Sequence, residues 1–144
     1  MNSLKMAVAL LILFIGMNVN AQSEKGKSEI VLITETLTDY IEGSTNGQPE
    51  RLKKAFHPNL NLYYVRNDSL RVWSGKAYIE DTKEGQPTGE VGKIIAIDYE
   101  NDIATAKVQI TSPGRTPYID YFMLLKIKGH WTIMHKMFTK QVNE

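Results

Sequence analysis

The chain has 144 residues, with 17 Lys and Arg against 16 Asp and Glu, 42% hydrophobic residues and no cysteine. This length corresponds to one domain, and the composition is that of a folded protein. The near-zero charge argues against a nucleic-acid binder and against an electrostatic membrane binder. The lack of cysteine excludes disulfides, thiolate metal sites and a cysteine nucleophile.

Residues 1–21 have the pattern of a secretory signal peptide. Lys5 supplies the positive start, and the apolar run over residues 6–17 is too short to span roughly 30 Å of hydrocarbon as a helix. Val19 and Ala21 then match a signal peptidase site. The pattern predicts a periplasmic or secreted protein without stable membrane insertion after cleavage. The alternative is an uncleaved N-terminal anchor.

Three helices are predicted after this segment. The first covers residues 28–42, where apolar residues recur at helical spacing, Ser28 can cap the start and Gly43 suits the stop. The second covers residues 49–56 between two prolines, and the third is a short helix over residues 74–83.

Strands are predicted for most of the remaining chain. Residues 22–27 are polar and are expected to be flexible, so the domain is expected to cover residues 28–144. Alternating patterns and turn residues predict strands over 60–66, 70–73, 91–99, 103–111, 118–127 and 131–138.

Pairing across two-residue turns assigns the side chains of two hairpins to faces. In the hairpin of residues 91–111, one face is expected to hold Ile95, Ile97 and Tyr99 opposite Ala104, Ala106 and Val108. In the hairpin of residues 118–138, Asp120 and His135 are expected to share a face with several aromatic residues.

The other face of the last hairpin is also apolar, with Tyr121, Met123, Leu125 and Met134 among its residues. A hairpin with two apolar faces needs cover on both sides. We therefore expect helices on one face and the second subunit of a homodimer on the other.

Several segments together carry a resemblance to a known family. These are Ala55-Phe56-His57-Pro58, the Ile-Ala-Thr-Ala-Lys-Val run at 103–108, and residues 120–127, which lead through Gly129 to the Trp-Thr-Ile run at 131–133. With the order of elements, they resemble the nuclear transport factor 2-like superfamily, in its SnoaL-like and putative lumazine-binding branch. The resemblance implies an α+β fold, in which a cone-shaped curved antiparallel sheet packs on N-terminal helices as a cystatin-like roll. Function does not follow from such a fold, which hosts enzymes and binding proteins alike.

The resemblance also implies a pocket between the sheet and the helices for a small apolar or aromatic molecule. The candidate ligand-binding residues are one histidine and seven aromatic residues, namely Tyr40, Phe56, His57, Tyr63, Trp73, Tyr78, Phe122 and Trp131. Tyr64 is an alternative to Tyr63. For each aromatic residue, plain core packing is the competing interpretation.

Asp120 and His135 are the candidate catalytic pair. A carboxylate among aromatic residues has a raised pKa, and a nearby imidazole can shuttle protons. The competing interpretation is a solvated Asp120 paired with Arg115 or Lys140, and a structural His135.

No cofactor or metal is expected. The sequence has no phosphate loop, no dinucleotide glycine pattern and no Gly-x-Ser-x-Gly elbow. His130 and His135 are five residues apart and are therefore expected on opposite faces of a strand, and no His-x-His or His-Glu-x-x-His spacing occurs.

Three hypotheses about function follow. The first is an exported small-molecule-binding domain without catalysis. The second is a cofactor-free acid–base enzyme of the isomerase, dehydratase or cyclase type, with Asp120 and His135 as base and acid. The third is a structural or accessory dimer module whose cone is filled by its own side chains.

Overall fold

The computed structural model describes residues 26–142, so the predicted signal peptide lies outside the described residues. Of these, residues 26–31 belong to one unit and residues 32–142 to a second. In the first unit the backbone N–H of Val31 donates to Ser28 Oγ at 3.4 Å. Ser28 therefore caps helix α3 (Glu29–Thr45) as predicted.

The helices of the described residues are α3, α4 (Pro49–Ala55) and α5 (Gly75–Asp81). The predicted stop at Gly43 was wrong, because α3 continues to Thr45. Gly43 instead permits a close approach of α4, since a Cβ added there would lie 2.8 Å from Leu52 Cγ. The positive φ that ends this region, 64°, belongs to Gly47.

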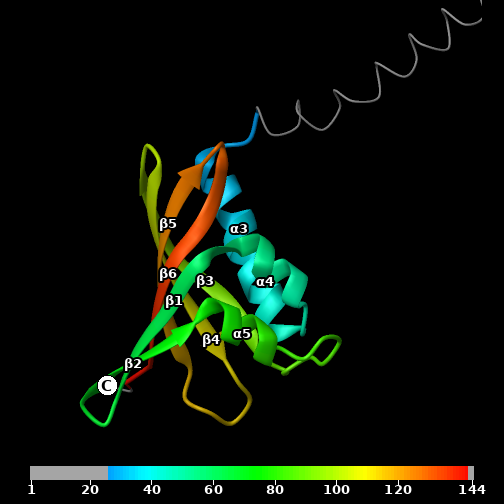
Figure 1. Cartoon of the computed structure of the whole chain (residues 1–144), viewed down its shortest axis with the longest axis vertical. Helices are drawn as coiled ribbons and strands as arrows, with labels where there is room; N and C mark the ends of the chain where they lie inside the picture. The colour runs from blue at the N-terminus through cyan, green and yellow to red at the C-terminus, as the bar shows by residue number, and fades with distance from the viewer. Residues whose placement is uncertain (1–25, 143–144) are drawn as a thin grey trace, which may run out of the picture. The chain divides into compact units, whose positions relative to one another are not determined.

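One six-stranded sheet follows, with the strand order β2-β1-β6-β5-β4-β3. Strand β1 pairs with β6 in parallel, and all other neighbours are antiparallel. The sheet is curved and unclosed (Figure 1). Its strands are β1 (Phe56–Arg66), β2 (Ser69–Ser74), β3 (Val91–Glu100), β4 (Ile103–Thr111), β5 (Tyr118–Ile127) and β6 (His130–Lys140).

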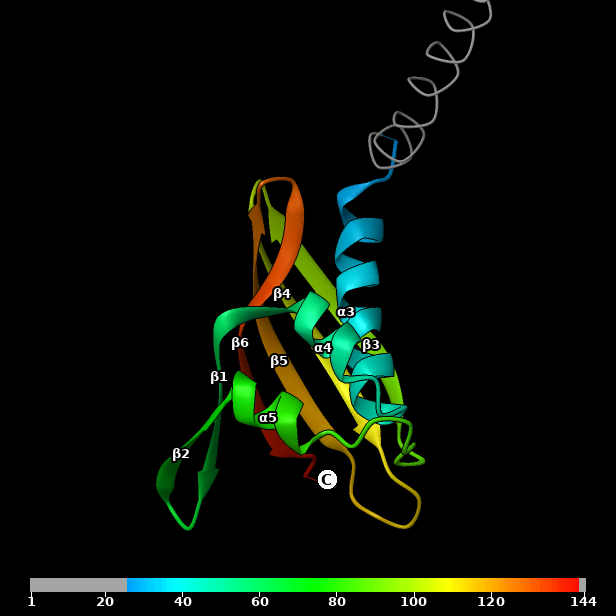
Figure 2. The ribbon, with the colours of Figure 1, turned by 45° about the vertical axis from the view of Figure 1, so that its right-hand side comes forward.

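The helices lie on one side of the sheet (Figures 1 and 2). Side chains from the helices and the sheet form the core. Ile33 and Leu37 of α3 and Leu52 of α4 are fully buried against this face. The sheet contributes every second residue of its central strands, including Ala104, Val108, Phe122, Leu124 and Ile133. This arrangement confirms the predicted α+β class with a curved sheet packed on helices.

One predicted set of partners in the β3–β4 hairpin was wrong. The register shifts between Ile94 and Ala96, so Ile94 rather than Ile95 lies opposite Val108. Ile95 is accordingly 45% exposed. A single extra residue in one strand exchanges the faces beyond it, which the assumption of regular alternation overlooked.

Candidate functional site

A tyrosine, an aspartate and a lysine from three different elements meet inside the fold, between α3 and the sheet. The hydroxyl of Tyr40 on α3 donates to Oδ2 of Asp120 on β5 at 2.6 Å. Lys136 Nζ on β6 donates to the Tyr40 oxygen at 2.6 Å and lies 3.0 Å from Asp120 Oδ2. Each of the three groups contacts the other two, and buried charged groups need such partners because they have lost their contacts with water. We call Tyr40, Asp120 and Lys136 the buried polar cluster.

Aromatic rings surround the ammonium group of this cluster. Lys136 Nζ lies 4.8 Å from the ring centroid of Tyr40, 5.1 Å from that of Phe138 and 5.4 Å from that of Tyr78. Asp120 is 1% exposed and Lys136 is 5% exposed. The ring faces attract the cation, and the charge of Asp120 balances it, so this pair carries no net charge.

The hydroxyl of Tyr40 remains protonated in this environment. Burial raises the pKa of Tyr40 well above its usual range, and the neighbouring Asp120 carboxylate and Tyr78 raise it further. Tyr40 therefore donates its proton to Asp120 while it accepts a hydrogen bond from Lys136. Chemically, the cluster is a chain along which a proton can be held or moved.

A β-bulge determines which side chain of β6 enters the cluster. In the β5–β6 ladder, Met123 pairs with His135 whereas Leu124 pairs with Ile133, so one residue of β6 between them has no partner. Beyond this bulge the faces of β6 are exchanged relative to regular alternation. Lys136 consequently points toward the helices.

The predicted shared face of Asp120 and His135 was therefore wrong. His135 lies on the opposite face of the sheet, where its ring centroid is 5.6 Å from that of Tyr63. Its Nδ1 is buried and has no hydrogen-bond partner among the described residues. Tyr63 and His135 line a hollow of about 390 Å³, which we call the outer hollow. Its other lining residues are Thr105, Tyr121, Phe122, Met123 and Met137.

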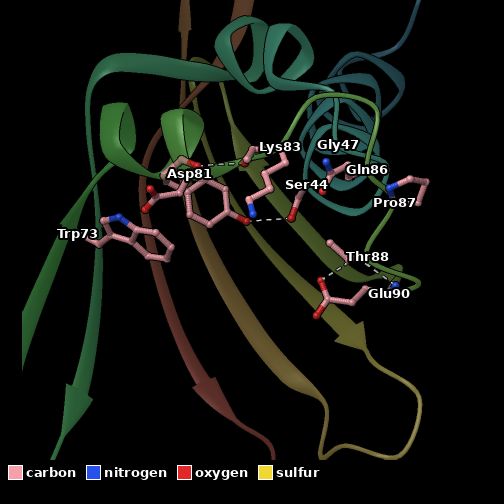
Figure 3. Close-up of a pocket in the computed structure, with 11 residues that line it drawn as sticks. Ser44, Gly47, Trp73, Asp81, Lys83, Gln86, Pro87, Thr88 and Glu90 are labelled. Carbon is pink, nitrogen blue, oxygen red and sulfur yellow. Dashed lines mark hydrogen bonds between the residues drawn. The ribbon is translucent and has the colours of Figure 1, made fainter.

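A pocket of about 380 Å³ lies beside the buried polar cluster, where the end of α3, helix α5 and the segment after α5 meet (Figure 3). Trp73 stands on one side and Thr88 and Glu90 on the other. We call it the Trp73 pocket; its lining is Ser44, Gly47, Trp73, Tyr78, Asp81, Thr82, Lys83, Gln86, Pro87, Thr88 and Glu90.

Helix α5 positions the aromatic side of this pocket. The N–H of Ala77 donates to Ser74 Oγ at 3.2 Å, which caps the start of α5. One turn later, the Tyr78 hydroxyl lies 2.8 Å from Ser44 Oγ on α3. The ring centroids of Trp73 and Tyr78 are 5.0 Å apart, edge to face.

Hydrogen bonds hold the polar side of the pocket to the end of α3. The N–H of Thr88 donates to the Thr45 carbonyl and that of Gly85 to the Gly47 carbonyl, both at 2.8 Å. Ser112 Oγ donates to Glu90 Oε1 at 2.7 Å. The Glu90 carboxylate is thus fixed in place.

Tyr78 connects the two regions. It lines the Trp73 pocket, and its ring is also one of the three that surround the ammonium group of Lys136. Tyr78 is therefore the side chain that separates the pocket from the ammonium group of Lys136.

The structure places the candidate ligand-binding residues in four environments. Trp73 and Tyr78 line the pocket, and Tyr63 lies at the outer hollow. His57, at the start of β1, accepts a hydrogen bond from the N–H of Asn59 at 3.2 Å. The remaining residues are almost fully buried core residues, namely Tyr40, Phe56, Phe122 and Trp131.

Lys136 is the residue that sequence reasoning missed. It is the only charged residue of residues 131–138, a segment in which the other polar residues are Thr132 and His135. A charge within such a strand is rarely buried unless it is paired, and this signal could have linked it to Asp120.

Within residues 26–142, no group of three or more His, Cys, Asp or Glu could hold a metal ion. Of the helices described, none is long and apolar enough to cross a membrane.

Residues 28–139 match the sequence pattern of the family described as putative lumazine-binding. The chain belongs to this family. A curated relative, Aldolase FrzH of a Cladobotryum species, is 26% identical over 114 residues, which cover 77% of this chain and 90% of that protein.

Solved structures agree with this family. An NTF2-like protein of unknown function from Methylobacillus flagellatus is 27% identical, with a TM-score of 0.69 over 81% of this chain and 97% of that chain. A putative scytalone dehydratase from Novosphingobium aromaticivorans is 19% identical, with a TM-score of 0.57 over 79% and 85% of the two chains. The predicted nuclear transport factor 2-like superfamily and α+β cone fold are thereby confirmed.

Proposed function

We propose that this lumazine-binding family member is an exported domain that binds a small, partly apolar molecule in the Trp73 pocket. The observation that carries the proposal is the double role of Tyr78. Its ring is shared between the pocket and the surroundings of Lys136, while its hydroxyl is 2.8 Å from Ser44 Oγ. A ligand in the pocket can thus contact two aromatic rings and approach a buried proton-holding cluster.

The lining favours a flat ligand with polar edges. The edge-to-face rings of Trp73 and Tyr78 offer apolar contact, and the side chains of Gln86 and Thr88 offer hydrogen bonds. The family description makes lumazine a reasonable first probe. The buried candidate Phe56 packs against Tyr78, with ring centroids 6.0 Å apart, and against Tyr40, with ring centroids 5.8 Å apart.

Tryptophan fluorescence tests the proposal, because the two tryptophans differ in position. Trp73 is half-buried at the pocket, whereas Trp131 is 4% exposed in the core. Titration with lumazine is expected to change the emission of the wild type, and Trp73→Phe is expected to remove that change while Trp131 still reports a folded core. Native mass spectrometry of the protein from its own host then looks for a retained molecule. Unchanged emission together with a bare mass would favour the filled-cone hypothesis.

A cofactor-free acid–base enzyme is the second proposal, favoured by the aldolase relative and by the buried polar cluster. In it, Asp120 accepts a proton from a substrate carbon while Tyr40 and Lys136 stabilise the developing negative charge. His135 takes no part, because it lies on the other face of the sheet.

Deuterium exchange at the carbons beside the carbonyl of 2-tetralone, followed by NMR in D₂O, tests this second proposal. The wild type is expected to accelerate exchange, and Tyr40→Phe is expected to lose most of the acceleration. Tyr63→Phe, at the outer hollow, is the matched control. Exchange at the rate of the buffer alone would eliminate the proposal for this class of substrate.

Export and a homodimer complete the proposal. Export rests on the pattern of residues 1–21. The dimer rests on exposed apolar side chains along β5, where Tyr121 is 48% and Met123 is 52% exposed.

A further inference from the structure

A second pocket, of about 480 Å³, lies where β1 and β6 end and β5 begins. Register places its residues side by side: Tyr118 pairs with Lys140, and Tyr63 pairs with Met137, so the next residues, Tyr64 and Phe138, are also neighbours. It shares no lining residue with the Trp73 pocket. Phe138 links it to the buried polar cluster, since Lys136 Nζ lies 5.1 Å from the centroid of that ring, but binding in this pocket can be tested separately from binding in the Trp73 pocket.

Three aromatic rings form one wall of this second pocket. Tyr64 and Phe138 are stacked, with a centroid distance of 4.8 Å and an interplanar angle of 27°. Tyr118 meets Phe138 edge to face at 6.1 Å. All three rings are only half-buried, so they offer aromatic surface to a ligand.

The charged groups of the lining are both cations. Arg66 and Lys140 are exposed, and neither forms an ion pair with an acidic side chain among the described residues. The other lining residues, Val65 and Thr139, carry no charge. The pocket therefore combines an aromatic wall with two positive charges that no acidic side chain of residues 26–142 pairs.

From this combination we propose that the pocket binds a small aromatic anion. The ring of the ligand packs against the exposed parts of Tyr64 and Tyr118, whose rings both contact Phe138, and its carboxylate or ionised hydroxyl pairs with Arg66 and Lys140. A neutral aromatic molecule would form no ion pair with Arg66 or Lys140, and an inorganic anion would make no contact with the aromatic rings. An aromatic cation would be repelled.

Two probes that differ only in charge test the proposal, namely 2-naphthoate and 2-naphthamide. Calorimetry is expected to give naphthoate about tenfold tighter binding to the wild type, because two charge-assisted pairs form. The double variant Arg66→Gln, Lys140→Gln is expected to bind the two probes equally. The control Lys93→Gln, Lys107→Gln removes two charges from β3 and β4 and is expected to keep the preference.

Amide chemical shifts locate the binding. Naphthoate is expected to perturb the signals of residues 64–66 and 138–140, and Tyr64→Leu is expected to weaken its binding. Equal affinities of the wild type for the two probes would overturn the proposal. So would an unchanged preference in the Arg66→Gln, Lys140→Gln variant, or perturbations confined to residues 82–90 of the Trp73 pocket. The last result would leave the proposed function standing while this inference fails.

Discussion

Nζ of Lys136 lies 3.0 Å from Oδ2 of Asp120, and both side chains are withdrawn from solvent. A pair of this kind contributes little net stability relative to an apolar pair, because desolvation offsets the attraction between the charges. Removing one member of the pair lowers the stability strongly, because the remaining charge stays buried without a partner. The third partner, Tyr40, adds a hydrogen bond to each member of the pair.

Asp120→Asn is therefore expected to lower the free energy of unfolding by about 3–5 kcal/mol, because it leaves the ammonium of Lys136 uncompensated. Urea denaturation measures the change. Replacing both charges, as in Asp120→Leu, Lys136→Met, is expected to recover much of the loss. Asp98→Asn, on the exposed part of β3, is the control and is expected to stay within about 0.5 kcal/mol. A small effect of Asp120→Asn alone would show that the pair is not buried in solution.

The raised pKa of Tyr40 predicts a loss of stability at alkaline pH. Below the ordinary tyrosine pKa both the folded and the unfolded states hold the proton, so the stabilisation is complete. Above roughly pH 10 the unfolded chain releases this proton and the folded chain keeps it, so stability falls by up to about 1.4 kcal/mol per pH unit. The loss continues until the pH passes the folded-state pKa.

Urea midpoints measured between pH 8 and pH 11.5 check this slope. Tyr40→Phe is expected to be less stable at pH 8 but to lose stability less steeply. Tyr99→Phe, at a position 41% exposed, is expected to keep the steep wild-type slope. Equal slopes for the wild type and Tyr40→Phe would contradict the assignment.

The sequence predicted most of the fold because its local signals agree with its tertiary structure. The strands β3 to β5 begin and end within one residue of their predicted bounds, and Ser28 and Ser74 cap their helices. Sequence reasoning also named Asp120 as a candidate catalytic residue and Trp73 and Tyr78 as candidate ligand-binding residues; in the structure Asp120 is buried, and the two aromatic residues line the Trp73 pocket. These predictions needed only periodicity, turns and caps.

The faces on which several side chains of β3 and β6 lie could not be predicted, because they depend on two β-bulges. An extra residue near Ile95 and another near Met134 exchange the faces of β3 and β6. Neither position has a glycine or another residue that marks a bulge in the sequence. Alternation therefore assigned His135 to the cluster in place of Lys136.

Deletion of Met134 is expected to preserve the fold, because it removes the unpaired residue and leaves Ile133, His135 and Lys136 on their present faces. Deletion of Met137 is expected to turn Phe138 away from the core, at a cost of about 3 kcal/mol or more. Circular dichroism and thermal unfolding of the two deletion variants distinguish these outcomes. Equal damage by both deletions would mean that the bulge itself is required.

Gly47→Ala is expected to damage the Trp73 pocket. A Cβ at this position would lie 2.4 Å from the carbonyl oxygen of Lys83 and 2.7 Å from the nitrogen of Gln86, both part of the pocket wall. The matched control is Gly89→Ala, where φ is also positive but nothing lies within 4 Å.

In both alanine variants the free energy of unfolding is expected to fall by about 1–2 kcal/mol, because alanine is strained in the left-handed backbone conformation. Gly47→Ala is expected to lose about 1–3 kcal/mol more through the clash, and to weaken any lumazine-induced change in Trp73 fluorescence. If the two variants behave alike in unfolding and in fluorescence, the contact between Gly47 and the segment after α5 does not persist in solution.

The exposed face of β5 predicts a dimer that a single charge can disrupt. Met123 stands between Tyr121 and Leu125 on that face, and these side chains are 52%, 48% and 37% exposed, respectively. Sedimentation is expected to show a dimer for the wild type and a dissociation constant at least about a hundredfold higher for Met123→Lys, because the interface would bury an unpaired ammonium. Leu70→Lys, at a 67% exposed position in β2, adds the same charge away from β5 and is expected to leave the dimer intact. A wild type that sediments as a monomer at millimolar concentration would end the dimer hypothesis, and the apolar face would then need another partner.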